Sequence, residues 1–262
     1  MLVTRSTFLP NSLFIRLTVN LSRLQKNFES LAAEDPLWTV LSDKSKRGGK
    51  WDPKEFFQSG EDCIRGLQER LERIGVYMTG GTALDFGCGV GRLTFPLSRR
   101  FERTIGIDIS ASMIEGAKLN SHRGHNCKFI LNTDENLSCI ETESIDFAHS
   151  DIVFQHIAPR YSKHYFLEIA RVMNPGGVFV FQLPSHLLRG SPFRKRLSYT
   201  LKAFLQKFGI GKAYFDMNAI PRKTIISYLE QQAGLTHIRD WDYPAAGPNW
   251  QSYLYAFQKP IQ

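Results

Sequence analysis

The stretch TALDFGCGVGR, residues 82–92, decides how this chain folds. A short apolar run leads directly into three glycines at alternate positions, Gly87, Gly89 and Gly91. A strand that enters a glycine-rich turn and then a helix brings backbone amides close to a bound molecule, because glycine adds no Cβ atom. The stretch therefore predicts the first strand of an α/β sheet, with a ligand site at the end of that strand.

Short apolar runs alternate with helical segments from this point onward. Strands are expected at TALDF, RTIGIDI, CKFIL, SIDFAHS and GGVFVFQLP, within residues 82–184. Strands that alternate with helices at this spacing form βαβ units, and these give a parallel sheet covered on both faces. A last helix in MNAIPRKTIISYLEQQAGL then precedes two closing strands, THIRDWDYP and QSYLYAFQK, which we expect to pair as an antiparallel edge.

The spacing of the glycines separates three kinds of glycine loop. The dinucleotide fingerprint G-x-G-x-x-G would need a third glycine where this chain has Arg92, and the phosphate loop G-x-x-x-x-G-K-[ST] is absent. The observed pattern is D-x-G-x-G-x-G, beginning at Asp85. This pattern resembles motif one of the class I S-adenosylmethionine-dependent methyltransferases.

The chemistry of S-adenosylmethionine agrees with the resemblance. This molecule carries an ammonium, a sulfonium and a carboxylate group but no phosphate, so a carboxylate such as Asp85 beside the loop is favourable. The glycines let the backbone lie against the methionine and ribose parts. Asp108 ends the next strand, where an acid can accept hydrogen bonds from both ribose hydroxyls. The structural alternative is a tight turn that binds no ligand.

Other segments match the same family over residues 60–183. NTDENL, residues 132–137, follows the third strand, where such enzymes hold the adenine, and it departs from the commoner G-D-A pattern. IDFAHSDIVFQHI, residues 145–157, resembles the fourth strand and the loop that faces the transferred methyl group. The resemblance implies a cofactor site made of Asp85, Gly87, Cys88, Gly89, Gly91, Asp108, Ile109, Met113, Asp134, Glu135, Asn136 and Ser150.

The resemblance also implies the architecture of the whole chain. We expect an α/β fold with a Rossmann-like, mostly parallel sheet of seven strands, helices on both faces and an antiparallel edge strand. Residues 1–59 would form an N-terminal helical and irregular extension that caps the pocket. Residues 60–262 would form the methyltransferase domain, with a helical insert at about 185–220. A packing helix is expected from about Glu61 to Ile74, where apolar residues recur at helical spacing.

Methyl transfer from a sulfonium is an in-line displacement, so the protein mainly supplies alignment. An oxygen nucleophile also loses a proton, and a base near the methyl group helps this step. His156 follows the fourth strand, at the carboxyl edge where open α/β sheets bind ligands, and imidazole suits proton removal at neutral pH. We therefore expect His156 and Gln155 to be catalytic. The alternative for His156 is a histidine bonded to the backbone that shapes this loop.

The sequence favours neither a metal nor a DNA substrate. Its four cysteines show no CxxC pairing, and Asp151 near His156 lacks the further acids that a magnesium site would need. The Asn/Asp-Pro-Pro-aromatic signature of adenine-N6 DNA methyltransferases is also missing after the fourth strand. We expect no metal ion and no nucleic-acid partner.

The distribution of charge bears on the acceptor. The net charge of +8 suggests an anionic partner, and residues 1–28 and 184–215 carry several Lys and Arg residues but no Asp or Glu. Within the insert, apolar residues recur at helical steps. Three interpretations stay open: a core-packing helix with a basic face, a lid over an anionic acceptor, or a membrane-surface helix that delivers a lipid-linked acceptor. The apolar stripe of the insert comprises Phe193, Leu197, Leu201, Phe204 and Phe208.

Three aromatic residues of the segment KWDPKEFF are expected to line the substrate pocket. Trp51, Phe56 and Phe57 lie in an expected loop, where large aromatic side chains are costly unless they pack or bind. Together with the insert they would roof the acceptor site.

The sequence therefore predicts a methyltransferase that moves a methyl group from S-adenosylmethionine to an oxygen or nitrogen of a small-molecule, glycan or lipid-linked acceptor. A cytoplasmic enzyme is expected, because no apolar run approaches the roughly 20 residues of a membrane span and the cysteines suggest reduced thiols. An organelle transit peptide within residues 1–28 is the alternative. The alternatives in function are an RNA methyltransferase and a non-catalytic regulatory protein that binds the same cofactor. The acceptor and the oligomeric state stay open.

Overall fold

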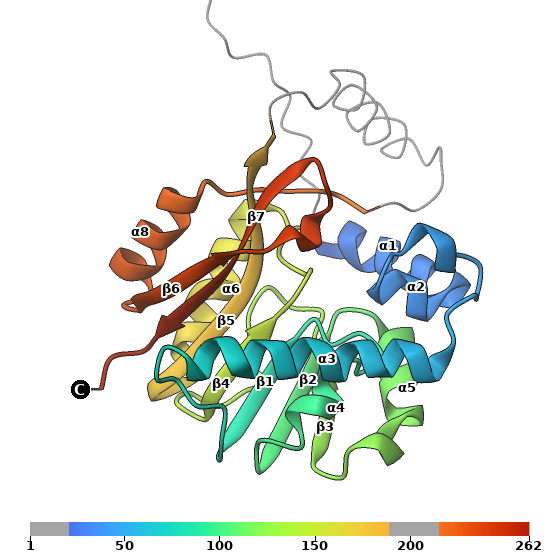
Figure 1. Cartoon of the computed structure of the whole chain (residues 1–262), viewed down its shortest axis with the longest axis horizontal. Coiled ribbons are helices and arrows are strands. Elements are labelled where there is room, and N and C mark those ends of the chain that lie inside the picture. The colour runs from blue at the N-terminus through green and yellow to red at the C-terminus, as the bar shows by residue number, and fades with distance from the viewer. Residues whose placement is uncertain (1–20, 189–214, 262) are drawn as a thin grey trace, which may run out of the picture.

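The structure, a computed structural model, describes residues 21–188 and 215–261, which form an α/β domain around one sheet (Figure 1). The strands follow the order β3-β2-β1-β4-β5-β7-β6. Strands β1 to β5 pair in parallel, and β7 pairs antiparallel with β5 and β6. The strands are β1 (Thr82–Phe86), β2 (Arg103–Asp108), β3 (Cys127–Leu131), β4 (Ile145–Ser150), β5 (Met173–Leu187), β6 (Thr236–Asp242) and β7 (Trp250–Gln258).

The seven-stranded, mostly parallel sheet confirms the predicted fold class. All five predicted parallel strands are present, and the two closing segments pair with each other as expected. The antiparallel strand β7 lies one place in from the edge, because it inserts between β5 and β6. The predicted apolar stripe of the insert lies outside the described residues, as do residues 1–20.

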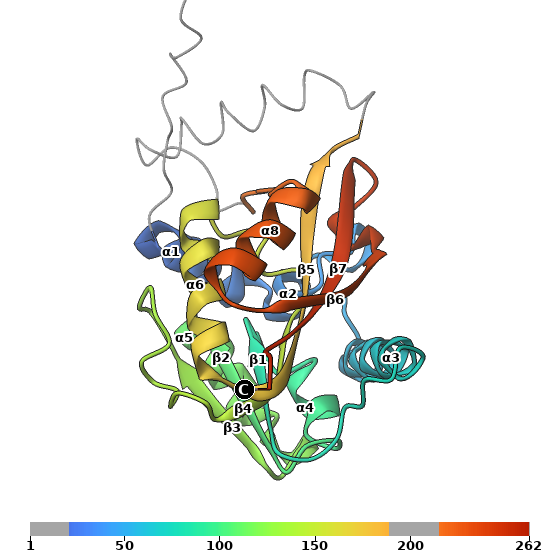
Figure 2. The same ribbon diagram turned by 90° about the vertical axis from the view of Figure 1, so that its left-hand side faces the viewer.

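Helices cover both faces of the sheet, as Figure 2 shows with α3 on one side of the strands and α6 on the other. Alternate side chains of β5 serve the two layers: Val178 and Val180 pack in the cluster of α3, while Phe179 and Phe181 pack in the cluster of α6 and α8. The helices are α1 (Leu21–Glu34), α2 (Pro36–Val40), α3 (Pro53–Glu72), α4 (Thr94–Leu97), α5 (Ala111–Leu119), α6 (Pro159–Val172) and α8 (Arg222–Gln232).

Helix α3 corrects one expectation. It begins at Pro53 rather than near Glu61, because the Asp52 side chain accepts a hydrogen bond from the Glu55 amide and proline occupies the first turn. Phe56 and the residue after it therefore lie on the buried face of a helix and not in a loop. The start signal, Asp52 followed by Pro53, is local and present in the sequence. The neighbouring aromatic residues instead suggested a binding loop.

Two other helices also begin at local signals in the sequence. The Ser110 side chain accepts a hydrogen bond from the Met113 amide at the start of α5, and α6 begins at Pro159.

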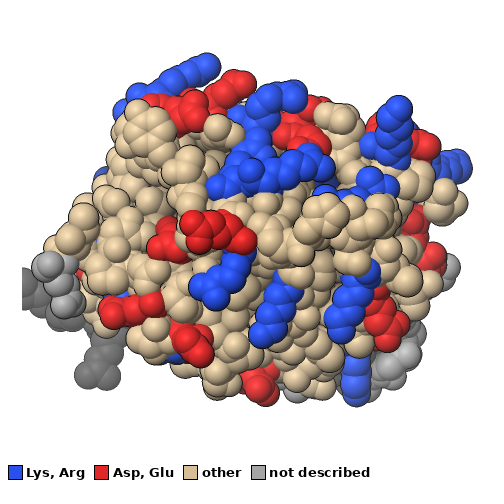
Figure 3. All heavy atoms as spheres, turned by 90° about the horizontal axis from the view of Figure 1, so that it is seen from below, with Lys and Arg blue, Asp and Glu red and all other residues tan. Residues whose placement is uncertain are grey.

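On the face of the molecule seen in Figure 3, lysine and arginine side chains are interspersed with aspartate and glutamate. In the described part of the chain no helix combines the length and apolarity that a membrane crossing requires.

Candidate active site

A cavity lies at the carboxyl ends of β1, β2 and β4, with α1 and α2 contributing to its wall. It holds about 1030 Å³ of empty space, part of which is open to solvent. Seven of the twelve predicted cofactor residues line it: Asp85, Gly87, Cys88, Gly89, Asp108, Ile109 and Met113. Five do not: Gly91, Asp134, Glu135, Asn136 and Ser150.

The glycine loop is held in place by β2 and is closely packed. The amides of Gly87 and Cys88 both donate to the Ile107 carbonyl, at 2.8 and 2.9 Å. Gly87 has φ +80°, and a Cβ atom there would lie 2.4 Å from a methyl carbon of Val153, in the loop after β4. Glycine is thus needed both for the backbone conformation and for the close approach of the neighbouring loop.

Asp108 connects this loop to helix α5. Its Oδ2 accepts a hydrogen bond from the Gly89 amide and its Oδ1 accepts one from the Ser110 amide, both at 2.9 Å. Burial raises the pKa of the Asp108 carboxyl to about 6. An ionised carboxylate can accept about four hydrogen bonds, so this side chain retains capacity for donors of a ligand in the cavity.

Helix α1 is attached to the same place. The Glu29 carboxylate accepts hydrogen bonds from the Ser110 hydroxyl, at 2.7 Å, and from the hydroxyl and amide of Ser112. These bonds lower the pKa of Glu29, although burial alone would raise it. A carboxylate at the N-terminus of a helix is also favoured by the helix dipole. The N-terminal extension is thereby fixed beside the cavity.

Asp85 lies one residue before the end of β1, and one of its two carboxylate oxygens is hydrogen-bonded within the protein. Its Oδ2 accepts a hydrogen bond of 2.6 Å from the Thr94 hydroxyl, and its Oδ1 lies 3.9 Å from Nδ1 of His149. Ser150, one strand away, donates to the Phe86 carbonyl at 2.9 Å and so ties β4 to β1. Ser150 therefore has a structural contact and no place in the cavity wall.

The loop after β4 contributes two features that the sequence interpretation missed. Asp151 lines the cavity opposite Arg92, whose Nη2 lies 3.8 Å from the Asp151 Oδ2. Ile152 has φ +61°, a left-handed conformation that is rare and costly for a β-branched residue. Such strain is concentrated at functional sites in proteins, and here it lies in the cavity wall.

His156 lines the cavity, while Gln155 is buried behind it. The His156 Nδ1 donates to the Asp216 carbonyl at 2.6 Å, so Nε2 accepts a hydrogen bond of 3.1 Å from the Gln155 amide group. Gln182 donates in turn to Gln155 at 3.2 Å. Burial lowers the pKa of His156 to about 4, so the imidazole is uncharged at neutral pH. These contacts match the alternative interpretation of His156, a histidine that is hydrogen-bonded to the backbone.

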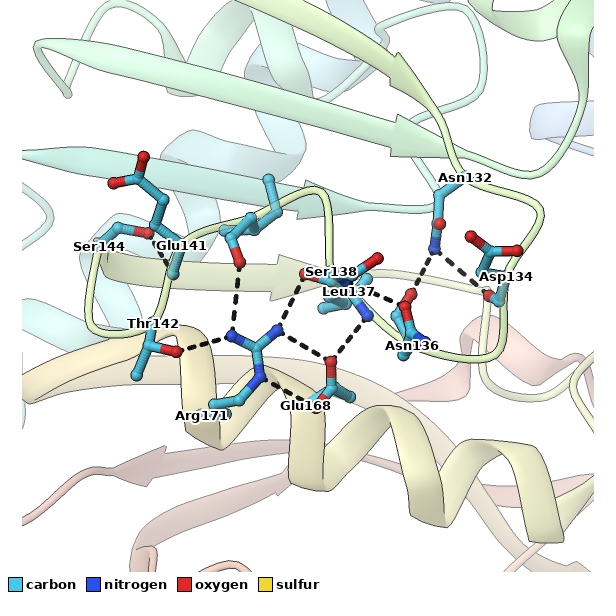
Figure 4. Close-up of polar contacts among 11 residues, drawn as sticks. Asn132, Asp134, Asn136, Leu137, Ser138, Glu141, Thr142, Ser144, Glu168 and Arg171 are labelled. Carbon is cyan, nitrogen blue, oxygen red and sulfur yellow. Dashed lines mark hydrogen bonds and ion pairs between the residues drawn. The ribbon is translucent and has the colours of Figure 1, made fainter.

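The segment after β3 is fixed by side chains of α6 and by its own first residue (Figure 4). The Arg171 guanidinium donates to the Leu137 carbonyl at 2.9 Å and to the Thr142 hydroxyl at 2.9 Å. Glu168, which is paired with Arg171, accepts from the Leu137 amide at 2.8 Å. Asn132, at the start of the segment, donates to the Asn136 carbonyl at 2.8 Å.

Asn132 and Tyr165, rather than the three predicted residues of this segment, reach the cavity wall. The Tyr165 hydroxyl donates to the Asp134 carbonyl at 2.5 Å. Asn132 is the first residue of the segment NTDENL and directly follows β3. This position at the carboxyl end of a strand is the sequence signal that could have identified it. Tyr165 comes from α6, and no local pattern connects it with this segment.

The three aromatic residues predicted for the substrate pocket pack elsewhere. Phe56 and Phe57 are buried in a hydrophobic cluster with Phe95, and Trp51 packs edge-on against Phe56. None of the three lines the cavity. The apolar wall is instead formed from α1 and neighbouring segments, by Leu21, Leu24, Phe28, Ile157 and Phe215. Among the described residues no group of three or more potential ligands is arranged to hold a metal ion.

Comparison with known proteins identifies similarity to methyltransferases. Residues 84–181 match a family model described as a methyltransferase domain. The chain is 35% identical over 80 residues to a tRNA (uracil-5-)-methyltransferase homolog B of Danio rerio, covering 30% of this chain and 17% of that protein. It is 32% identical over 107 residues to a ubiquinone biosynthesis O-methyltransferase of a Bradyrhizobium species, covering 39% of this chain and 40% of that protein. The chain thus spans less than half the length of these two relatives.

A solved structure extends the likeness to nearly the whole fold. The magnesium protoporphyrin IX methyltransferase of Synechocystis, with bound S-adenosylhomocysteine, aligns with a TM-score of 0.62 at 16% identity. The alignment covers 91% of this chain and 99% of that one. At this identity the likeness concerns the fold.

Proposed function

The chain belongs to the class I S-adenosylmethionine-dependent methyltransferases, and from this we propose that it transfers a methyl group from S-adenosylmethionine to a small-molecule acceptor. The observation that carries the proposal is the position of Asp108 beside Gly89 in one cavity wall, at the carboxyl edge of the sheet. Open α/β sheets bind ligands at this edge, and an acid at the end of the second strand can bind ribose hydroxyls.

The residues of the cavity fit the parts of this cofactor. Asp108 would accept hydrogen bonds from the ribose hydroxyls, and Ile109 and Asn132 lie in the wall next to it, on the side of β3, where they would contact the adenine. The glycine loop offers close backbone approach for the chain that links ribose and amino acid. The bound cofactor would supply an electrophilic methyl group on sulfur, and this chain would supply its alignment.

The acceptor that we propose has an apolar body. The part of the wall formed by α1 and the segment near His156 is apolar or aromatic, from Leu24 and Phe28 to Ile157 and Phe215. Burying an apolar acceptor there would be favourable by about 25 cal/mol per Å² of apolar surface removed from water. The similarity to an O-methyltransferase of ubiquinone biosynthesis also supports an oxygen acceptor on such a molecule. We propose in addition that α1 and α2 form the cap predicted for residues 1–59.

His156 would orient the acceptor rather than remove its proton. Its low pKa of about 4 makes it a weak base at neutral pH, and both ring nitrogens are already hydrogen-bonded within the protein, so the uncharged ring would position the acceptor by packing against it. Gln155 would hold the ring in this orientation through its contact with Nε2. An acceptor that ionises readily, such as an acidic phenol or a carboxylic acid, would need no stronger base.

A methyl-transfer assay with radiolabelled S-adenosylmethionine tests the proposal. Phenolic and carboxylic small molecules would be screened with wild type, Asp108→Ala and the exposed control Asp62→Ala. We expect labelled product with wild type and the control and a large loss with Asp108→Ala. Transfer only to added RNA, with a steep dependence on salt, would contradict the small-molecule acceptor. Cofactor binding without transfer to any acceptor class would favour the non-catalytic regulatory protein.

A further inference from the structure

A second cavity lies apart from the candidate active site, between α3, α4 and the 3₁₀ turn Ser121–Arg123 (Figure 1). It holds about 520 Å³ of empty space, part of which is open to solvent. The residues that line it are all different from those that line the first cavity. Two of them, Lys54 and Phe57, belong to KWDPKEFF, the segment whose aromatic residues are predicted from the sequence to line a pocket.

The wall of this second cavity carries an excess of positive charge. Lys54, Arg99 and Arg123 contribute three cations, and Glu61 contributes one carboxylate. Glu61 is already paired with Arg99. Lys54 and Arg123 have no carboxylate partner within residues 21–188 and 215–261. Two uncompensated cations in the wall of one cavity attract an anion.

The Arg123 guanidinium is held in one orientation by the protein. Its Cζ lies 4.0 Å from the centroid of the Phe57 ring, and its Nε makes a long hydrogen bond of 3.4 Å to the Asn120 side-chain oxygen. A guanidinium stacked on an aromatic ring keeps its other N–H donors in its own plane, and this planar fork matches two oxygens of a phosphate. Arg123 is therefore oriented for an anion before a ligand arrives.

The floor of the cavity is apolar. Phe57 and Phe95 are 8% and 1% exposed, and Pro96 is buried beside them. Such a floor suits the organic part of a ligand, and the volume lies in the range of small-molecule pockets. A phosphate monoester carries a charge of about −1.5 to −2 at neutral pH, which matches the two cations that lack a carboxylate.

We propose that this cavity binds a small phosphate monoester with an aromatic or apolar body. Arg123 and Lys54 would contact the phosphate, and Phe57 and Phe95 would contact the body. The site is separate from the one for methyl transfer, so the proposal does not rest on the proposed function. It gives a place in the fold to the anionic partner that the net charge of +8 suggests.

Calorimetry on the full chain with phenyl phosphate, inorganic phosphate and phenol tests the proposal, at low ionic strength because salt screens exposed charges. Phenyl phosphate should bind most tightly, since it alone has both the dianion and the ring. Arg123→Gln should weaken it by about 5- to 30-fold, and the exposed Lys54→Gln by about two- to fivefold. Arg65→Gln is the matched control and should change its affinity less than about twofold, because Arg65 lies on the same helix outside the cavity.

Glu61→Gln should change the affinity in the opposite direction. It removes the one carboxylate among the described residues of the wall and releases Arg99, so phenyl phosphate should bind about two- to fivefold more tightly. Misfolding cannot produce this gain, which keeps the test valid if Arg123→Gln is not folded by circular dichroism.

Three results would overturn the proposal. The first is equal affinity for phenyl phosphate in wild type, Lys54→Gln and Glu61→Gln, since the charges of this cavity would then play no part. The second is binding of inorganic phosphate or phenol as tight as that of phenyl phosphate. The third is displacement of phenyl phosphate by a lower concentration of a short single-stranded RNA, which would assign the cavity to a polymer. None of them bears on the cofactor site, so the proposed function would stand.

Discussion

Val40 of α2 lies so close to Gly89 that a Cβ atom on this glycine would come within 2.5 Å of the Val40 Cγ2 atom. The same Gly89 donates its amide hydrogen to Asp108. One glycine therefore joins three parts of the molecule: the N-terminal extension, the loop after β1 and the end of β2. Its φ of +53° is also in the left-handed region that favours glycine.

Gly89→Ala should reduce the free energy of unfolding by about 2 to 4 kcal/mol, from backbone strain together with the clash with Val40. Urea denaturation measures this change. Gly48→Ala is the matched control, because Gly48 has φ +82° but no atom within 4 Å of a built Cβ atom. Adding Val40→Ala to Gly89→Ala should recover part of the loss. If the double variant is no more stable than Gly89→Ala, the contact does not limit this position.

The depressed pKa of His156 predicts a pH dependence of stability. As the pH falls from 6.5 to about 4, the unfolded chain binds a proton at this residue while the native protein does not. The native state is therefore destabilised over this window, by up to about 3 kcal/mol from this group.

Denaturation of His156→Gln between pH 7 and 4 checks this prediction. The variant should lose less stability than wild type as the pH falls, whatever its stability at pH 7. The control is His164→Gln, since His164 is exposed on α6. Parallel stability curves for wild type and His156→Gln would contradict the predicted protonation.

Regular features of the sequence predicted the fold well. The alternation of strand and helix patterns located all five parallel strands, and local start signals are present at Ser110 for α5 and at Pro159 for α6. These signals are local, because periodicity and capping depend on residues within one or two turns. The start of α3 at Pro53 was missed, although Asp52 and proline form a local capping signal, since the neighbouring aromatic residues suggested a binding loop.

The glycine loop and Asp108 were also predictable, because spacing along one βαβ unit fixes them in space. The rest of the cavity wall depends on contacts between distant segments. Arg92 and Asp151 lie 59 positions apart in the numbering and meet only when β1 and β4 pair side by side. Phe28 of α1 reaches the cavity through tertiary packing that no sequence motif encodes. The predicted pocket residues Phe56 and Phe57 had the apolar character of a binding surface but fill the core.

Glu29 is expected to fix α1 over the cavity. Glu29→Gln removes the charge that accepts from Ser110 and Ser112, and should lower stability by about 1 kcal/mol and speed hydrogen exchange of α1 amides. Glu34→Gln makes the same change on an exposed position of the same helix and should have little effect. Equal exchange rates in the two variants would show that the contact does not hold α1.

Arg171 is expected to fix the segment after β3. Arg171→Met removes its hydrogen bonds to Leu137 and Thr142 and its pairing with Glu168. We expect faster hydrogen exchange in residues 132–144 and a loss of stability of about 1 to 2 kcal/mol, because the guanidinium is partly exposed. Arg222→Met removes a different ion pair, with Asp240, and should leave exchange in this segment unchanged.

The most direct test of the central claim is a calorimetric titration of S-adenosylmethionine into wild type and Asp108→Ala at neutral pH. Loss of two hydrogen bonds to an ionised carboxylate predicts an affinity at least about a hundredfold lower in the variant. Micromolar binding to wild type together with this loss would establish the cofactor site at Asp108 and the glycine loop. No binding to folded wild type, or equal binding to both proteins, would contradict the account.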